Sequence, residues 1–366
     1  MEWLWVGAGL VVVVGTLADA FDTLLATGIE GSRFSPTAIF YQRTWKPWRS
    51  VGGRIRSVRR RERWMALYGP LSIIGLLCMW TAGQILGWSL VWWGLRGHFV
   101  TPVHSFGSAL YYSGVVYFSI GFGDILAGGG SARILTVVEA FGGLGTLGLV
   151  IGFLPSLNAA YQAREQQLLL LDDLGDVRIT PATLVRSYLR KPGDRSDLDA
   201  MFDGWTVWCA EVFESHSSFP MLVLFRSKYR GHSWVTALGV VTDAAIASLA
   251  ITPGSGRDPA MRLYRQSCRL VRSLAERLGL EPAPYEPLGA RWWSIAYSGL
   301  QSQGFETRSF EDSHQRLNEL RREFHPYMEA FIDALLAPRG FWGVTSAEHM
   351  AQAEIGSFLL DEADDD

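Results

Sequence analysis

Cysteine and charged residues are both scarce in this 366-residue sequence, and their scarcity excludes several classes of protein. The three cysteines, Cys78, Cys209 and Cys268, stand at no spacing that metal sites use, so reduced thiols are the simplest interpretation. The net charge is only −3, which provides no general attraction to nucleic acid. We therefore expect no nucleic-acid partner.

Catalytic motifs are also missing, because the sequence contains no HExxH, nucleophile elbow or P-loop. Glu214, His216 and Asp243 are capable of acid–base chemistry, but nothing in the sequence brings them together. His314 and His325 lack a partner at metal-ligand spacing. We therefore expect neither an enzyme nor a bound cofactor.

Hydrophobic residues, in contrast, make up 48% of the chain, and it has 15 Trp and 39 Gly. Three segments approach the ~20 apolar residues that a membrane-spanning helix needs: residues 3–25, 67–93 and 134–157. Residues 1–10 contain no Lys or Arg, so the first segment is interpreted as a retained helix rather than a signal peptide. The sequence thus predicts an all-α membrane protein.

The loop between the first two spans sets the orientation. Residues 28–65 contain ten Lys and Arg residues but only Glu30 and Glu62 as acids, and such an excess is typical of a cytoplasmic loop. The N-terminus is then expected outside, the second span runs outward, and the third returns to the cytoplasm with the C-terminus. This predicts a multi-pass protein of the cell (inner) membrane.

A short glycine-containing stretch lies between the second and third spans. Alternate glycines allow a backbone in which successive carbonyls point the same way. Such carbonyls, repeated around a symmetry axis, replace the hydration shell of a cation. The stretch consists of Ser119, Ile120, Gly121, Phe122, Gly123 and Asp124.

This stretch resembles the selectivity filter of potassium channels, Thr-Val-Gly-Tyr-Gly followed by Asp, with Ser119 in place of Thr and Phe122 in place of Tyr. The resemblance extends over residues 65–161, with residues 105–117 at the place of the pore helix and an apolar inner helix after the filter. It implies a potassium-channel-like pore of two helices and a re-entrant loop. The first span is then one extra N-terminal transmembrane helix.

The resemblance also implies a homotetramer in the lipid bilayer that conducts potassium. The ion would bind the carbonyls of Ser119, Ile120, Gly121 and Phe122, Gly123 would complete the filter, and Asp124 would add negative potential at the outer mouth. Two alternatives stay open. One is a weakly selective cation channel, because the filter departs from the family pattern. The other is a membrane-anchored sensor whose pore-like segment does not conduct.

The expected inner helix contains several glycines that suit bending or close packing at a gate, and Pro155 removes a backbone donor near its inner end. Residues 143–148 also match GxGxxG, but they lie in an apolar helix without the strand that a dinucleotide site requires, so a cofactor site is rejected there. The candidate hinge residues are Gly142, Gly143, Gly145, Gly148 and Gly152.

Acidic residues inside spans are costly and often functional. Asp19 and Asp22 share one face near the inner end of the first span. Two hypotheses are a proton- or cation-sensing pair and an ion pair with the arginine-rich loop or a neighbouring helix. Glu139, in the third span, is interpreted as a hydrogen-bonding acid behind the filter.

The rest of the chain predicts a helical cytoplasmic domain with an acidic tail, without the βαβ series or strand-rich pattern of nucleotide-binding domains. Residues 234–251 are apolar, but the central Asp243 favours a core helix over a fourth span. Helices are expected at residues 181–190, 198–215, 234–251, 259–279, 287–301 and 310–336. The predicted parts are the N-terminal helix (1–27), the basic loop (28–65), the pore domain (66–160) and the cytoplasmic domain (161–366).

Two basic features of this domain offer sites for an unidentified cytoplasmic ligand, which would act on the gate through residues 159–171. Arg226, Lys228 and Arg230 form a basic turn that suits a phosphate-bearing ligand. A second set recurs at helical spacing and suits anionic lipid headgroups or the acidic residues 361–366 of a neighbouring copy. A solvated face with structural ion pairs is the alternative for both. The second set consists of Arg262, Arg265, Arg269 and Arg272.

Overall fold

The computed structural model describes residues 1–24, 35–172, 180–189, 194–227, 233–253, 259–302 and 307–338. Within these ranges the regular structure is helical, and the one β-type pairing is an isolated bridge between Phe99 and Ala127. The prediction of an all-α protein is confirmed. The chain divides into two compact units, one of Met1–Gln162 with Ser215–Arg226, the other of Ala163–Glu214 with Ser227–Asp366.

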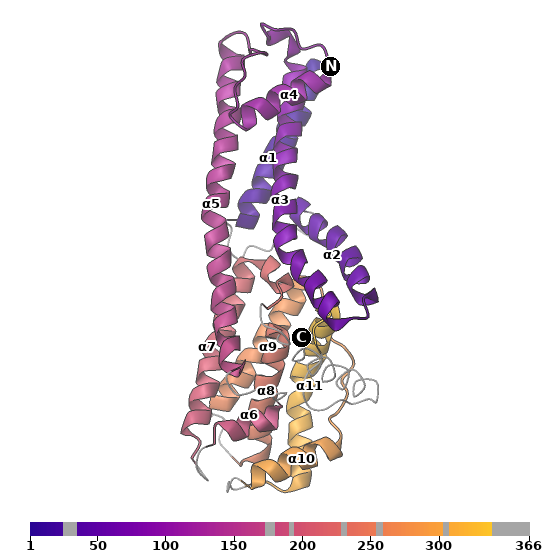
Figure 1. Cartoon of the computed structure of the whole chain (residues 1–366), viewed down its shortest axis with the longest axis vertical. Coiled ribbons are helices and arrows are strands. Elements are labelled where there is room, and N and C mark those ends of the chain that lie inside the picture. The colour runs from indigo at the N-terminus through magenta and orange to yellow at the C-terminus, as the bar shows by residue number, and fades with distance from the viewer. Residues whose placement is uncertain are drawn as a thin grey trace, which may run out of the picture. The chain divides into compact units, whose positions relative to one another are not determined.

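The first unit contains three helices that are long and apolar enough to cross a membrane, α1, α3 and α5. The pore helix α4 lies between α3 and α5 in the sequence (Figure 1). The inner helix α5 and the later helix α7 each contribute residues to both units. The helical elements of this unit are α1 (Glu2–Leu24), α2 (Pro36–Arg54), α3 (Val58–Gly94), η1 (Arg96–His98), α4 (Phe106–Tyr117), α5 (Gly130–Asp172) and η2 (Pro220–Leu224).

Small residues hold α1 against α3, the two helices that Figure 1 shows side by side. A Cβ added to Gly9 would lie 2.5 Å from the carbonyl oxygen of Gly87, and one added to Gly83 would lie 2.5 Å from Cγ2 of Thr16. Only hydrogen fits at these positions, so the two backbones approach closely, as membrane helices with small interfacial residues do. The extra N-terminal helix is therefore packed on the outer helix of the pore.

The basic segment that was predicted as a loop is largely helical. The Ser35 side chain accepts a hydrogen bond from the Ala38 amide (3.0 Å), and Pro36 occupies the first turn, so α2 begins with a regular N-cap. Trp48 and Trp64 stack at 4.1 Å, and each indole N–H donates to the backbone carbonyl of the other residue, at 3.2 and 3.1 Å. These contacts fix α2 against the start of α3.

A short segment late in the sequence also belongs to the first unit. Residues 215–226 were assigned to the cytoplasmic domain, but η2 packs instead on the pore helices. Leu222 is fully buried in a cluster with Ile73 of α3 and with Phe153 and Leu157 of α5. The sequence of η2 does not predict this location, because a short apolar segment can be buried in the core of either unit.

The second unit is a helical domain around α8. Of the residues in α8, 89% are buried, and α6, α9 and α11 pack against it. Although α8 is long and apolar enough to span a membrane, its own unit covers it, which confirms the prediction of a core helix. The helices of this unit are α6 (Pro181–Ser187), α7 (Ser196–Ser218), α8 (Trp234–Ile251), α9 (Pro259–Leu278), α10 (Ala290–Gln301) and α11 (Phe310–Leu335).

A polar network lies inside this core. Arg321 donates to the Asp243 carboxylate at 2.8 Å, and Nε2 of His325 lies 2.9 Å from the same carboxylate. The Arg321 and Asp243 side chains are both almost completely buried. Asp243 and His325 therefore have a structural role in this core, and the described residues contain no group of His, Cys, Asp or Glu that suits a metal ion.

Candidate ion-conduction pathway

Helix α4, at the place expected for a pore helix, ends just before residues 119–124, which we call the filter stretch after the resemblance noted above. Ser105 caps its first turn by accepting a hydrogen bond from the Ser108 amide at 3.1 Å. After Tyr117 the helix stops, and the amides of Ser119 and Ile120 donate to carbonyls of the last helical turn, both at 2.9 Å. The filter stretch is therefore anchored at its start to the C-terminal end of α4.

Backbone dihedrals alternate along this stretch. Ser119, Gly121 and Gly123 have left-handed φ values of 56°, 66° and 76°. Ile120 and Phe122, which lie between them, are not among the residues with positive φ. Two of the three left-handed positions are glycine, which pays no Cβ penalty, whereas Ser119 costs about 1–2 kcal/mol. Ser119, Gly121 and Gly123 thus share a backbone conformation that the residues between them lack.

The filter stretch is uncovered in a single copy of the chain. Ile120 is 52% and Phe122 is 68% exposed, and a Cβ added to Gly121 or Gly123 would meet no atom within 4 Å. Large apolar side chains exposed next to each other on one short segment can mark an interaction surface. The space around the stretch is available to further copies of the chain.

Behind the filter, a buried carboxylate joins three helices. Glu139 of α5 is fully buried and accepts hydrogen bonds from the Trp92 indole of α3 (2.6 Å) and from the Ser113 hydroxyl of α4. The Tyr112 and Thr136 hydroxyls form a second link between α4 and α5 at 2.7 Å. Glu139 is thus a hydrogen-bonding acid, as interpreted from the sequence. Its partners Trp92 and Ser113 were missed, because nothing in the sequence pairs residues so far apart.

Asp124 directly follows the filter stretch, at the position expected to add negative potential at the outer mouth. Its carboxylate interacts with the Tyr111 hydroxyl of the pore helix. This contact links the residue after the filter stretch to the middle of the pore helix. Asp124 therefore holds the loop in addition to carrying negative charge.

Of the five candidate hinge glycines in α5, Gly143 is the one with a close neighbour. A Cβ there would overlap the Tyr117 carbonyl oxygen, at the junction of the pore helix and the filter stretch. The helix continues without interruption through Pro155. Gly143 is therefore a packing residue, whereas a Cβ at the other four would meet nothing within 4 Å: Gly142, Gly145, Gly148 and Gly152.

At its inner end, α5 contacts the segment 215–226. The rings of Phe153 and Phe219 meet edge to face at 5.6 Å, and the Tyr161 hydroxyl donates to the Arg226 carbonyl at 2.9 Å. The Phe225 ring covers Gly69 of α3, where an added Cβ would lie 2.9 Å from it. The segment thus touches both the outer and the inner helix of the pore.

The two acidic residues of α1 have different surroundings. Asp19 is 5% exposed and accepts hydrogen bonds from the Trp80 indole (2.7 Å) and from the Thr37 amide and hydroxyl (3.2 and 2.6 Å). Because Thr37 lies in the first turn of α2, the carboxylate also faces the positive end of that helix. Asp22 is exposed. The structure therefore does not bring the two carboxylates into one site.

The basic turn proposed as a phosphate site is only partly described. The Arg226 guanidinium lies 3.7 Å from Glu62 in an ion pair, and burial lowers its pKa. Lys228 and Arg230 lie outside the described residues. Arg226 therefore has a structural partner in the first unit.

Comparison with known proteins agrees with this geometry. Residues 74–157 match the family model described as "Ion channel". These residues form an ion-channel pore domain. The match begins within α3, includes the pore helix and filter, and ends within α5.

The chain is also similar to a protein described as an uncharacterized membrane protein, YdjJ, from Bacillus subtilis (strain 168). The two are 24% identical over 245 residues, which cover 65% of this chain and 67% of the relative. No solved structure is significantly similar to the chain. The pore domain thus belongs to a multi-pass membrane protein with several apolar helices.

Proposed function

We propose that four copies of this chain form a channel that conducts potassium ions passively across the cell membrane. The alternating left-handed φ values at Ser119, Gly121 and Gly123, in a pore-loop setting, carry the proposal. Four such stretches around one axis would surround a dehydrated cation with carbonyl oxygens. Potassium would be the transported substrate, and the Ser119 hydroxyl would lie at the inner end of the filter.

Fourfold assembly would also cover the exposed apolar surface of the inner helix. Only 11% of the most apolar window of α5 is buried within one copy. Neighbouring copies would cover one side of it, and lipid or the water-filled pore the rest. Large exposed side chains on α5 include Ile134, Val137, Phe141, Leu144, Leu147 and Ile151.

The proposed orientation places the N-terminus outside and the second unit in the cytoplasm. It rests on the basic residues of α2 and the start of α3, which favour the cytoplasmic side. The filter then faces the outside and the segment 215–226 lies at the inner end of the pore. The proposed location is the inner membrane of a bacterial cell, with the second unit on the cytoplasmic side.

The segment 215–226 is the proposed link between the cytoplasmic unit and the gate. Its two ends continue directly into the second unit, at Glu214 and Ser227. Its rings contact Phe153 and Tyr161 of the inner helix and Gly69 of the outer helix. A cytoplasmic ligand that favours one position of this segment would favour one state of the pore.

Ion flux through the purified protein in liposomes tests the proposal. A potassium gradient should drive flux and an equal sodium gradient should not. Gly121→Ala should abolish flux because a Cβ disfavours the φ of +66°. Gly114→Ala is the matched control, since Gly114 lies within α4 with nothing near the added Cβ, and it should conduct normally.

Other outcomes distinguish the alternatives. Equal flux of sodium and potassium would indicate a weakly selective cation channel instead of a potassium channel. Ser119→Thr would then be the first substitution to test for a gain in potassium selectivity. Intact tetramers without flux, for wild type and for Gly121→Ala alike, would favour a sensor whose pore-like segment does not conduct.

A further inference from the structure

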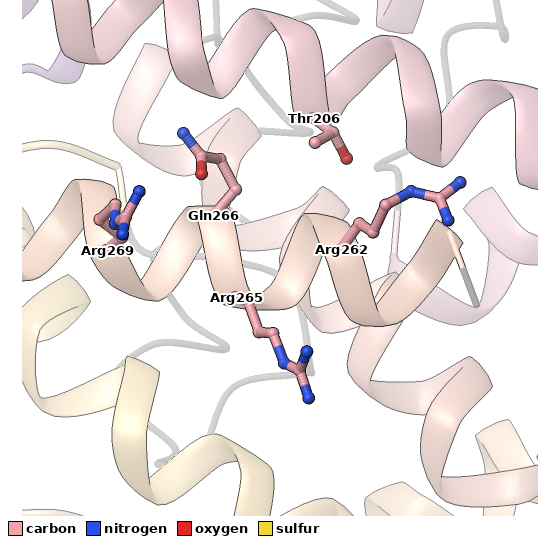
Figure 2. Close-up of a pocket in the computed structure, with 5 residues that line it drawn as sticks. All are labelled: Thr206, Arg262, Arg265, Gln266 and Arg269. Atoms are coloured by element: carbon pink, nitrogen blue, oxygen red, sulfur yellow. The ribbon is translucent and has the colours of Figure 1, made fainter. Parts of the chain in front are cut away.

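A row of arginines follows one face of α9 in the second unit. Arg262, Arg265 and Arg269 line a cavity of about 480 Å³ together with Gln266 and with Thr206 of α7 (Figure 2). A second cavity of about 280 Å³ shares Arg265 and Arg269 and extends the row to Arg272. The opposite face of α9 is buried in the core of the unit. We call these four arginines the arginine row.

The arginine row lowers the stability of α9 when no anionic partner is bound. Like charges at spacings of three and four residues repel each other, and Arg262 and Arg265 lie near the positive end of the helix dipole. Asp203 neutralises Arg262 at 2.7 Å, and Arg272 lies over the Tyr327 ring at 5.9 Å. Within the described part of the chain, Arg265 and Arg269 form no ion pair. Both side chains are exposed, so an anionic partner has access to them.

The shape of the row favours an extended partner. From Arg262 to Arg272 the helix rises ~15 Å, and the two cavities lie one after the other along it. Residues 361–366 of this chain, Asp-Glu-Ala-Asp-Asp-Asp, contain five acids in six residues. In extended form six residues measure ~20 Å. Length and charge therefore match between the two segments.

The path from α11 to the row is short enough. The Tyr264 hydroxyl of α9 donates to the Leu320 carbonyl of α11 at 3.1 Å, and Arg272 lies over Tyr327, so the two helices run parallel. The end of α11 at Leu335 is thus level with the end of α9. From there back to Arg269 and Arg262 is ~17–27 Å along the helix. Residues 339–360 span up to ~75 Å when extended, which is ample.

We propose that the arginine row on α9 binds the acidic segment 361–366 of its own chain. The carboxylates of the segment pair with Arg265 and Arg269, and neighbouring acids reach Arg272 and the Gln266 amide. Planar guanidinium groups suit bidentate carboxylate binding. The proposal does not depend on ion conduction, because both partners belong to the second unit.

Cysteine cross-linking of the full-length protein in detergent tests it. Ala363→Cys is combined either with Gln266→Cys in the row or with Gln315→Cys, an exposed position on α11, as the matched control. The yield of intramolecular cross-link at residue 266 should exceed that at residue 315 about fivefold at low salt. It should fall to the control yield near 1 M salt, where the Debye length is only ~3 Å.

Charge neutralisation on either side provides the specificity control. The double substitution Arg265→Gln/Arg269→Gln and the triple substitution Asp364→Asn/Asp365→Asn/Asp366→Asn should each lower the yield at residue 266 about fivefold. Arg291→Gln, which removes an exposed arginine of α10, should leave it unchanged. Because the tail substitutions lie outside the described fold, they keep the test valid even if the α9 variant is unstable.

Three outcomes would overturn the proposal. The first is equal yield at residues 266 and 315. The second is a cross-linked dimer instead of a monomer, which would assign the segment to a neighbouring copy. The third is control-level cross-linking together with binding of phosphatidylglycerol vesicles that Arg265→Gln/Arg269→Gln weakens, which would assign the row to lipid headgroups.

Discussion

Helices α5 and α8 are both long and apolar enough to cross a membrane, yet a single copy of the chain treats them in opposite ways. In α8, 89% of the residues are buried, whereas in the apolar window of α5 only 11% are. Apolar composition therefore indicates that water is excluded from a helix, but not what excludes it. The rest of its own unit excludes water from α8, whereas for α5 we propose that lipid and further copies of the chain do so.

The largest effect expected from this difference concerns the buried charge in α8. Arg321→Met removes the partner of Asp243 and should lower the free energy of unfolding of the second unit by ~3–5 kcal/mol. Thermal unfolding followed by circular dichroism measures it. Arg316→Met, which breaks an exposed pair with Glu319, should cost at most ~1 kcal/mol. Equal effects of the two substitutions would contradict a closed core around α8.

A second prediction concerns the place where α5 is tightly packed. Gly143→Ala should destabilise the pore by ~1–3 kcal/mol, because the new methyl overlaps the Tyr117 carbonyl and must displace the end of the pore helix. Gly142→Ala, one residue earlier with open space, should be tolerated. Thermal stability of the assembled protein and potassium flux report the difference. If Gly143→Ala were tolerated, α5 would not be tightly packed at this position, and the prediction would be contradicted.

The two aspartates of α1 sharpen the same contrast between covered and uncovered positions. Asp19→Asn should cost ~1–2 kcal/mol, because the charge that accepts hydrogen bonds from Trp80 and Thr37 is lost. Asp22→Asn should change stability by less than ~0.5 kcal/mol. Unfolding of the purified protein in detergent measures both. Similar losses would revive the hypothesis that the two carboxylates act as a pair.

The smallest effect is on thiol reactivity and leaves stability unchanged. Cys209 and Cys268 lie in the second unit, where burial raises the pKa of each thiol to about 12. Cys78 of α3 is exposed on the surface of its unit. A maleimide should therefore leave Cys209 and Cys268 unlabelled in the native protein near pH 7 and label them only after denaturation, while lipid or detergent shields Cys78 within the span. Rapid native labelling of Cys268 would indicate that the α9 side of the core opens.

Much of the pore could be predicted from sequence because its signals are local. The apolar runs, the pore-helix position and the alternate glycines at positions 121 and 123 all lie close together in the chain, and their geometry follows from backbone sterics. The left-handed φ of Ser119 was not predictable in this way, since serine carries no such preference. Ser119 comes directly after Phe118, the C-cap residue of the pore helix.

Contacts between distant residues could not be predicted. Asp19 had a plausible arginine partner in the basic loop, but the structure gives it Thr37 and Trp80, since the N-terminus of α2 supplies amides as well as charge. Helix α2 was missed because its many basic residues were interpreted as a loop, although Ser35 followed by Pro36 is a regular helix start. Likewise, nothing in the residues of η2 indicated that they complete the pore unit.

The return of residues 215–226 to the first unit has a consequence for biosynthesis. The ribosome makes the three spanning helices first, but Leu222 joins the cluster only after translation has continued from the end of α5 at Asp172 through the whole of α7. Until then Phe153, Leu157 and Ile73 have no cover from η2. A fragment that ends at residue 162 would also lack η2 and therefore the contacts that η2 makes with α3 and α5. The C-terminal half of the gene is thus needed to finish the N-terminal half of the molecule.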